Sequence, residues 1–342
     1  MAPARILMVR LSSLGDVVLT TPVLAGIKSS WPGARVTVLT KKQFSPVFLG
    51  NPHVDEIAVF EDRGVWGWIL EIRRRRFDVL VDLHDTIRSR LWSFFSGAAQ
   101  RVRYDKRSAA RRLLVWFKKD SPRLLVGIVD RYGESLSPLG ISLEDRTPRL
   151  YFSPEERLSA AWETRLGTGP FIALAPGALH ATKRWFPDRF SEVAHRLSLQ
   201  TGYPIVLLGA QADVPAAEAV LQTLPGPVQS LVGKTSLREM MWVLRKCALL
   251  ISNDSGAMHV GAALGVPTVA LFGPTVKAFG FFPTGKGTTV VEVPSLACRP
   301  CSLHGSTRCP QKHFRCMGDI SVDQVVAAAN ELLSVGPAGK RP

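Results

Sequence analysis

The chain has 342 residues, 46% of them hydrophobic, and this length is enough for two domains of ordinary size. No run of about 18 apolar residues is present, which argues against a membrane-spanning helix, and residues 1–9 lead straight into an apolar strand instead of a signal peptide. The formal net charge is +15, and residues 88–123 carry eleven Lys or Arg against two Asp, a local net charge of +9. This basic segment predicts an anionic partner (nucleic acid, an acidic membrane surface or a phosphorylated substrate), the alternative being a solvated basic face.

Strand-like and helix-like patterns alternate along the whole chain. Strands are predicted at residues 5–10, 35–40, 56–60, 79–83, 171–175, 204–208, 248–251 and 268–272. Helices are predicted at residues 16–30, 66–76, 187–201, 214–224, 237–246 and 322–333, the last with Ser321 as N-cap. This alternation is typical of α/β proteins with doubly wound parallel sheets, and it predicts two Rossmann-like domains, residues 1–155 and 168–334, followed by a disordered tail at 335–342.

The first predicted strand runs into a polar turn that contains Ser13, Gly15 and Asp16. This turn is not G-x-G-x-x-G, so a dinucleotide cofactor is disfavoured. A carboxylate at this position can take a proton from a substrate hydroxyl, and it can equally serve as an N-terminal helix cap.

Three further turns follow strands of the second domain. The first holds Gly177 and Lys183, and a glycine-containing loop with a cation near a helix start can neutralise a diphosphate. The second contains Asp213, which is placed to bind a ribose hydroxyl or to cap the next helix. In the third, the helix that starts near Ser255 offers free backbone N–H groups and a positive dipole end, which suit a phosphate.

The segments 13–16, 183–187 and 253–259 together resemble the motifs of glycosyltransferase family 9, the heptosyltransferases of lipopolysaccharide core synthesis. The resemblance extends from about residue 5 to residue 333. It implies the GT-B architecture, in which two Rossmann-like domains face each other across a cleft. It also implies inverting transfer from ADP-L-glycero-D-manno-heptose to the inner core of lipopolysaccharide, which is Kdo- or heptosyl-Kdo-lipid A, with no metal and no cofactor.

The resemblance also assigns roles to individual residues. It implies that domain 1–155 binds the acceptor, with Asp16 as the general base, and that domain 168–334 binds the donor, with Lys183 against the diphosphate. The donor-binding residues are then Gly177, Lys183, Asp213, Thr235, Ser236, Asp254, Ser255, Gly256 and His259. The expected acceptor-binding residues are Ser13, Gly15, Arg88 and Arg107.

The basic segment acquires a use in this interpretation. Lipid A and Kdo carry phosphates and carboxylates. We therefore expect Arg88, Arg107 and residues 111–119 to bind both the acceptor and the inner leaflet of the membrane. We therefore expect a cytoplasmic protein that associates peripherally with the inner face of the inner membrane.

Four of the five cysteines cluster at positions 298, 301, 309 and 316. Four thiolates can bind a structural zinc ion, but the intervals are not those of a familiar zinc ribbon, so free thiols remain the alternative. A reducing compartment disfavours disulfides. Cys247 lies in a predicted strand and is assigned to the core.

Other functions remain open from the sequence alone. One is a related family 9 transferase with a different sugar or acceptor, and another is a GT-B-fold epimerase that acts on a nucleotide sugar. A nucleic-acid-binding protein is disfavoured because no RNA- or DNA-binding motif is present, so no nucleic-acid partner is expected.

Overall fold

The computed structural model describes residues 3–119, 121–285 and 287–334. It divides into two compact units, the first formed by Met1–Ser108 and Val126–Pro154 and the second by Ala109–Leu125 and Glu155–Pro342. The tail predicted at 335–342 lies outside the described residues. In the described part of the chain, none of the helices has the length and hydropathy that crossing a membrane requires.

Unit 1 is built on a five-stranded parallel sheet with the order β3-β2-β1-β4-β5. The strands are β1 (Arg5–Val9), β2 (Arg35–Lys41), β3 (Glu56–Phe60), β4 (Val79–Asp82) and β5 (Gln100–Arg103). β1 is central, and its Ile6 lies opposite Val36 on one side and Val79 on the other. Because the chain fills the sheet outward from β1 in both directions, the strand order reverses between β1 and β4, where such sheets bind ligands.

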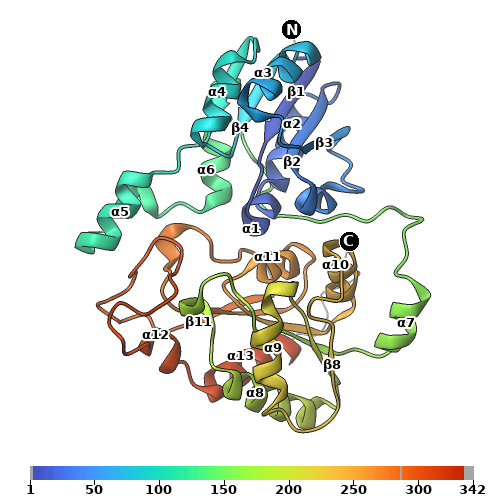
Figure 1. The fold of residues 1–342 in the computed structure, drawn as a ribbon, viewed down its shortest axis with the longest axis vertical. Coiled ribbons are helices and arrows are strands. Elements are labelled where there is room, and N and C mark those ends of the chain that lie inside the picture. The colour runs from blue at the N-terminus through green and yellow to red at the C-terminus, as the bar shows by residue number, and fades with distance from the viewer. Residues whose placement is uncertain (1–2, 120, 286, 335–342) are drawn as a thin grey trace. The chain divides into compact units, whose positions relative to one another are not determined.

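Helices α3 (Gly64–Arg75) and α4 (Ile87–Phe95) lie side by side in unit 1 (Figure 1). Their Trp68 and Trp92 share one buried core with Leu7 and Val9 of β1, so both helices cover the same face of the sheet. The other helices of this unit are α1 (Leu14–Val18), α2 (Thr21–Ser30) and α6 (Ile128–Glu134), of which α2 and α6 pack together.

The helix predicted over 16–30 is wrong in one respect, because it is divided into α1 and α2. Pro22, in the first turn of α2, has no N–H to bond to a carbonyl of the preceding turn. The hydroxyls of Thr20 and Thr21 donate instead to the carbonyls of Val17 and Val18, at 2.7 and 2.9 Å. This break leaves Asp16 in a short helix of its own.

Unit 2 is built on a six-stranded parallel sheet with the order β11-β10-β9-β6-β7-β8. The strands are β6 (Ile172–Ala175), β7 (Ile205–Leu207), β8 (Val228–Ser230), β9 (Leu249–Asn253), β10 (Thr268–Phe272) and β11 (Thr288–Glu292). Here the strand order reverses between β6 and β9, so the loops that follow these two strands flank the ligand position expected for this sheet.

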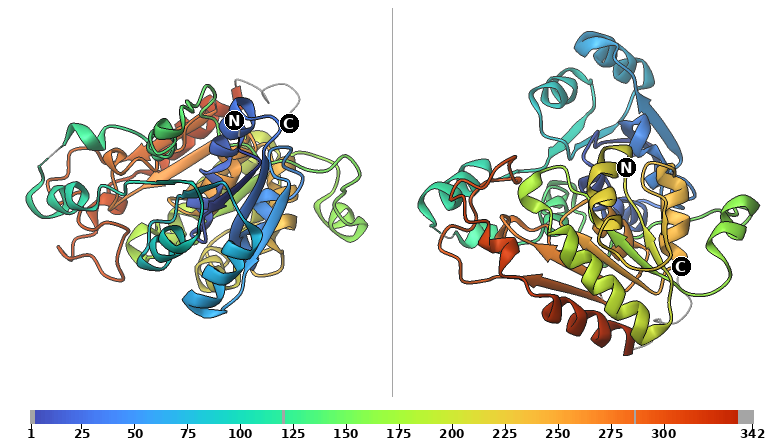
Figure 2. Two further views of the ribbon diagram at one scale, coloured as in Figure 1. Left: turned by 90° about the horizontal axis from the view of Figure 1, so that it is seen from above. Right: turned by 60° about the horizontal axis from the view of Figure 1, so that its bottom comes forward.

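Three helices of unit 2, α8 (Pro187–Thr201), α9 (Val214–Leu221) and α13 (Val322–Ser334), pack against one face of its sheet (Figure 2). Ser321 accepts a hydrogen bond from the backbone N–H of Gln324, which confirms it as the cap of α13. The remaining helices are α5 (Ser108–Phe117), α7 (Ala160–Leu166), α10 (Leu237–Lys246), α11 (Gly256–Ala263) and α12 (Arg315–Gly318).

The segment Ala109–Leu125 belongs to unit 2, although it lies in the middle of the first predicted domain. Arg111 of α5 is buried, with its guanidinium 5.1 Å from the ring centroid of Phe279 and 3.3 Å from the carbonyl oxygen of Leu303. Lys118 donates to the carbonyls of Cys298 and Pro300. Arg111 and Lys118 therefore anchor α5. Arg111 is buried and Lys118 is exposed, and the contact of residues 111–119 with acceptor and membrane stays a prediction.

The buried Asn253 side chain joins the two loops at the point where the strand order of unit 2 reverses. Its Nδ2 donates to the carbonyl oxygen of Pro176 after β6 at 2.8 Å, and its Oδ1 accepts from the backbone N–H of Trp185 at 3.1 Å. The side chain of Asn253 is fully buried. One amide group therefore fixes the end of β9 against the loop that follows β6.

Replacing Asn253 with Ala should lower the free energy of unfolding of unit 2 by about 1–3 kcal/mol, because the Trp185 N–H and the Pro176 carbonyl lose their buried partner. Urea unfolding followed by tryptophan fluorescence measures this loss. The matched variant Asn330→Ala, on the exposed side of α13, should change stability by no more than about 0.5 kcal/mol. An equally small change for Asn253→Ala would contradict the role given to this amide.

Candidate functional site

A buried ion pair occupies the edge of the unit 2 sheet where the strand order reverses. Lys183, in the short 3₁₀ helix Ala181–Lys183, places its Nζ 2.7 Å from Oδ2 of Asp254, directly after β9. The same carboxylate oxygen accepts from Oγ1 of Thr275 at 2.7 Å. Both side chains are largely buried, with 15% and 8% of Lys183 and Asp254 exposed. Two predicted donor-binding residues are thus in direct contact.

Helix α11 begins immediately after this pair, with Ser255 as N-cap and Gly256 as the first helical residue. The hydroxyl of Ser255 lies 3.2 Å from that of Ser252 and makes no capping hydrogen bond to the helix. The first N–H groups of α11 therefore meet no side-chain cap, which is the arrangement that favours an anion. His259, one turn further, is buried, with its ring 6.5 Å from that of Phe281.

Gly177 and Asp213 lie against each other beside the same loops. A Cβ atom at position 177 would be only 2.1 Å from Cγ of Asp213, so only glycine permits this contact. Oδ2 of Asp213 accepts from the backbone N–H of Ala210 at 2.9 Å and thereby closes the turn that leads into α9. Asp213 stands at the N-cap position of α9, but its side chain makes no capping hydrogen bond to that helix, so the predicted capping role is not observed. Ribose binding by Asp213 stays a prediction.

Thr235 and Ser236 follow β8, two strands away from β6 on the same carboxyl edge of the sheet. Ser236 is the N-cap of α10, and its Oγ accepts from the backbone N–H of Glu239 at 3.2 Å. Thr235 is half-buried. Ser236 thus has an observed role as a helix cap, and the contact of Thr235 and Ser236 with the donor stays a prediction.

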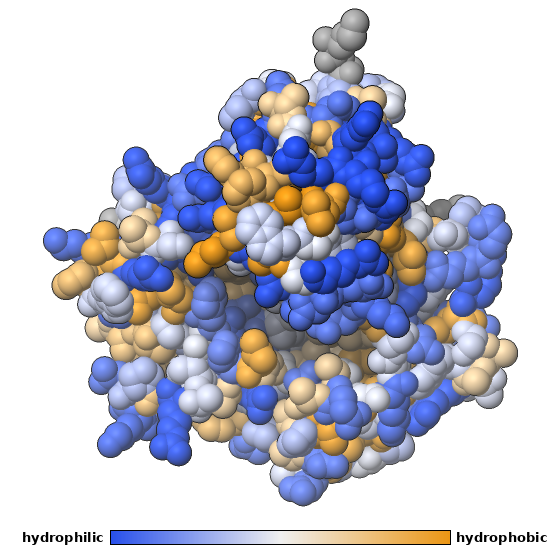
Figure 3. Space-filling view, turned by 45° about the horizontal axis from the view of Figure 1, so that its top comes forward, coloured by the Kyte–Doolittle hydropathy of each residue, from blue (hydrophilic) through white to orange (hydrophobic). Residues whose placement is uncertain are grey.

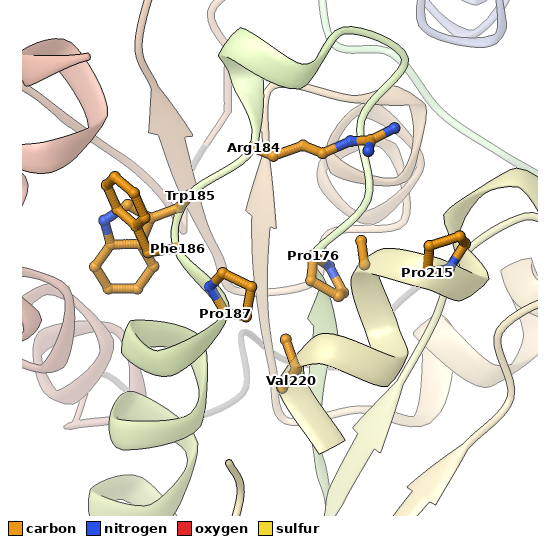
Figure 4. A pocket seen from close by; sticks show the side chains of 8 residues that line it. Pro176, Arg184, Trp185, Phe186, Pro187, Pro215 and Val220 are labelled. Atoms are coloured by element: carbon orange, nitrogen blue, oxygen red, sulfur yellow. The ribbon is translucent and has the colours of Figure 1, made fainter. Parts of the chain in front are cut away.

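A pocket of about 260 Å³ opens next to these loops (Figure 4). Figure 4 shows Pro176, Pro187, Pro215 and Val220 around one space, with Arg184 reaching to the loop after β6, where its Nε donates to the carbonyl of Ala178 at 2.9 Å. The other residues that line the pocket are Trp185, Phe186 and Ala216. Most of these side chains are apolar. Several of them are close neighbours in the sequence of the predicted donor residues Gly177, Lys183 and Asp213.

Asp16 lies at the corresponding position of unit 1, at the start of α1. Its Oδ1 is 2.7 Å from a guanidinium nitrogen of Arg10, and its Oδ2 accepts from the hydroxyl and the backbone N–H of Ser13, at 2.7 and 3.3 Å. Gly15 is buried in the same turn. The carboxylate of Asp16 thus closes the first turn of α1 and is held on both oxygens, while 17% of the side chain stays exposed.

Arg10 was not predicted as a site residue, because it reads as the last residue of a strand. Its guanidinium is almost fully buried, donates to the carbonyl of Leu83 at 2.5 Å, and lies 5.8 Å from the ring centroid of Tyr132. Burial raises the pKa of the Tyr132 hydroxyl well above its ordinary value. Arg10 therefore fixes the orientation of Asp16 from a rigid, buried position.

A second polar group, also not predicted, follows β4 across the reversal point of unit 1. The buried Asp82 accepts from the backbone N–H groups of His84 and Asp85, both at 2.9 Å. Lys106 donates to the carbonyl of Asp85 at 2.6 Å. Burial, together with the positive charges of Arg10 and Lys106, lowers the pKa of His84 to about 4. The signal in the sequence was a His-Asp pair directly after a buried strand.

The two arginines predicted to bind the acceptor lie on different elements of unit 1. Arg88, on α4, is exposed, with its guanidinium 5.5 Å from the ring centroid of Phe60. Arg107 forms an ion pair with Glu134 of α6. Their contact with an acceptor stays a prediction.

None of the five cysteines, all of which lie in the described part of the chain, forms a disulfide. Burial and the neighbouring Cys301, together with Cys309 and Cys298, raise the pKa of Cys316 to about 11. Within residues 3–119, 121–285 and 287–334, no group of three or more His, Cys, Asp or Glu side chains has a geometry that would hold a metal ion.

The low pKa of His84 makes a prediction for the pH dependence of unit 1. Its folded pKa of about 4 lies below the ordinary value of 6.5, so the unfolded chain takes up the proton first as the pH falls. The contribution of neutral His84 to the folding stability of unit 1 is complete above about pH 6.5 and is lost as the pH falls toward 4. NMR titration should show one imidazole signal, absent in His84→Gln, with a midpoint near 4. A midpoint near 6.5 would contradict this burial.

Comparison with known proteins agrees with this geometry. The chain matches the family model "Glycosyltransferase family 9 (heptosyltransferase)" over residues 66–310. It is 25% identical to lipooligosaccharide heptosyltransferase 2 of Haemophilus influenzae, over 96% of this chain and 99% of that protein. The crystal structure of a family 9 glycosyl transferase from Veillonella parvula has 25% identity and a TM-score of 0.80, covering 97% of this chain and 98% of that one.

The fold is also that of E. coli ADP-heptose lps heptosyltransferase II, with 24% identity, a TM-score of 0.77, and coverage of 98% and 100% of the two chains. These neighbours and the two parallel sheets confirm the predicted α/β fold class of GT-B type. The family match covers well over half of the sequence. The chain therefore belongs to glycosyltransferase family 9, the heptosyltransferase family, and is a glycosyltransferase.

Proposed function

We propose that this protein transfers heptose from ADP-L-glycero-D-manno-heptose to the inner core of lipopolysaccharide, with inversion at the anomeric carbon and without a metal ion. The observation that carries the proposal is the Lys183–Asp254 pair at the start of α11, inside the matched family region. The family membership and the similarity to a lipooligosaccharide heptosyltransferase support the choice of sugar and acceptor class.

In the proposed donor complex, the diphosphate lies at the N-terminus of α11, against the backbone N–H groups of Ser255 and Gly256. The ammonium of Lys183 has three donors, so it can bind a phosphate oxygen while it stays paired with Asp254. As the bond between the anomeric carbon and the phosphate oxygen breaks, negative charge grows on the departing ADP. The cation and the helix start stabilise that charge from fixed positions.

In the proposed acceptor complex, Asp16 takes the proton of the attacking hydroxyl. The oxygen of that hydroxyl forms the new bond to the anomeric carbon on the face opposite the departing ADP, which inverts the centre. Arg10 and Ser13 hold the carboxylate of Asp16 in one orientation, as a general base requires. Gly177, Asp213, Thr235, Ser236 and His259 complete the proposed donor site.

The proposed acceptor is Kdo- or heptosyl-Kdo-lipid A, an anionic lipid-linked saccharide. Arg88 and Arg107 are the cations of unit 1 that we assign to its phosphates and carboxylates. Because such an acceptor is anchored in the inner leaflet, the proposed location is the cytoplasm, at the inner face of the inner membrane. A family 9 transferase with another sugar or acceptor is the second candidate.

Binding of the nucleotide separates these candidates from an epimerase of the same fold class. ADP should raise the melting temperature of the protein, and UDP should not, because the proposed donor is an ADP sugar. A thermal-shift titration with both nucleotides measures this difference, and a selective response to UDP would overturn the choice of donor.

Replacing Asp16 with Asn should reduce heptosyl transfer by about 10²- to 10⁴-fold, because the amide cannot accept the proton of the hydroxyl. ADP affinity, measured by calorimetry, should stay within about twofold, since Asp16 belongs to unit 1. The matched variant Asp62→Asn, exposed in the loop before α3, should retain full activity on a water-soluble acceptor. Turnover by purified Asp16→Asn at the wild-type rate would remove Asp16 from the reaction.

Replacing Lys183 with Met should weaken ADP binding by about 10- to 100-fold, the effect of losing one charge-assisted hydrogen bond. Lys183→Arg keeps the charge and should lose less. The control is Lys246→Met at the end of α10, where the ammonium pairs with Glu163. Equal ADP affinity of the Met variant and the wild type would show that Lys183 does not contact the diphosphate.

A further inference from the structure

Helices α3 and α4 of unit 1 carry large apolar side chains on their outward faces. On α4, Ile87, Leu91 and Phe94 are 80%, 38% and 69% exposed, and their spacing places them on one side of the helix. On α3, Trp66 and Leu70 are one turn apart and each is 69% exposed. The inward faces of both helices already fill the core, so these outer residues are additional to it.

The two rows of apolar side chains adjoin each other. Trp66 of α3 lies 5.8 Å from Phe95 of α4, and Phe95 lies 4.9 Å from Phe94, measured between ring centroids. We call the five exposed residues Trp66, Leu70, Ile87, Leu91 and Phe94 the α3–α4 surface. Figure 3 shows hydrophobic side chains gathered in this part of unit 1, bordered by hydrophilic ones. An exposed apolar patch of this kind marks an interaction site.

Exposed arginines border the α3–α4 surface. Arg90 is neutralised by Asp85, and Arg74 by Glu71. Four other exposed arginines, Arg73, Arg76, Arg88 and Arg101, form no ion pair with a carboxylate in the described part of the chain. Apolar side chains beside unneutralised cations are complementary to an anionic lipid surface, whose head groups bind arginine and whose acyl boundary accepts Trp, Leu and Phe.

We propose that the α3–α4 surface docks this protein on an anionic lipid membrane. This inference rests on the proposed function, because a lipid-linked acceptor requires the enzyme to work at a membrane. A second copy of the chain fits the surface less well, since a twofold contact through it would bring the same unneutralised arginines of both copies together. The docking side chains are separate from Asp16 and from the donor residues.

The proposal differs from the expectation that residues 111–119 hold the membrane. Arg111 of that segment is buried in unit 2, and Lys118, although exposed, donates to two carbonyls there, whereas the four arginines without a carboxylate partner beside the α3–α4 surface are all exposed. Leu113, Trp116 and Phe117 of α5 are nevertheless exposed and provide a direct comparison.

The test is co-sedimentation of the full chain with vesicles of phosphatidylcholine alone or with phosphatidylglycerol added, in the absence of donor and acceptor. The wild type should bind the anionic vesicles, less at high salt, and the double variant Leu70→Gln/Phe94→Gln should bind at least about tenfold more weakly. Arg73→Gln/Arg101→Gln should lose the preference for anionic lipid. The control Leu179→Gln/Leu199→Gln, also at exposed leucines, should bind like the wild type.

Equal binding of the wild type and Leu70→Gln/Phe94→Gln would overturn the proposal, as would a loss seen only in Trp116→Gln/Phe117→Gln. Sedimentation that shows a wild-type dimer abolished by Leu70→Gln/Phe94→Gln would assign the surface to a second copy instead. ADP binding and transfer to a water-soluble acceptor should be unchanged in this variant. If vesicle binding fails while transfer persists, only the docking surface is wrong; if transfer from ADP-heptose itself fails in the wild type, the proposed function is wrong.

Discussion

The buried ion pair between Lys183 and Asp254 is the interaction on which the proposed donor site depends. Burying two charges costs much of what their attraction gains, so such a pair is weak evidence for stability on its own. Its value here is positional, because Thr275 donates to Asp254, and Asp254, which directly precedes the N-cap of α11, pairs with the ammonium of Lys183. The neighbouring Asn253 fixes the same strand end to the loop after β6. Two consecutive side chains thus set the geometry of the site.

Unit 1 uses a related device for a different task. Its strand order also reverses, between β1 and β4, and the loop after β1 carries the ion pair of Arg10 and Asp16. In unit 2 a carboxylate positions a cation that we assign to a phosphate. In unit 1 a cation positions a carboxylate that we propose accepts the proton of the attacking hydroxyl. Both pairs are largely buried at the edge of a sheet. Their charged groups are therefore already in place and need little rearrangement when charge develops during the reaction.

Much of this could be predicted from local sequence pattern. The helices 187–201 and 237–246 and the strands 56–60 and 268–272 have the predicted bounds, because each combines a clear period with a turn or cap at its ends. Contacts between distant residues could not be predicted. The anchoring of α5 depends on the contacts of Arg111 with Phe279 and Leu303, and the position of Asp213 in its turn depends on a glycine at position 177. Arg10 was missed because its partner and its burial become visible only once β1 and β4 are paired.

The most direct test of the central claim is mass spectrometry of a defined, truncated lipopolysaccharide core incubated with the enzyme and ADP-L-glycero-D-manno-heptose, followed by NMR of the anomeric centre of the product. The account predicts that the acceptor gains the mass of one heptosyl residue as ADP is released, and that the new linkage has the anomeric configuration opposite to that of the donor. An unmodified acceptor, a product formed only from a UDP sugar, or a linkage with retained configuration would contradict it.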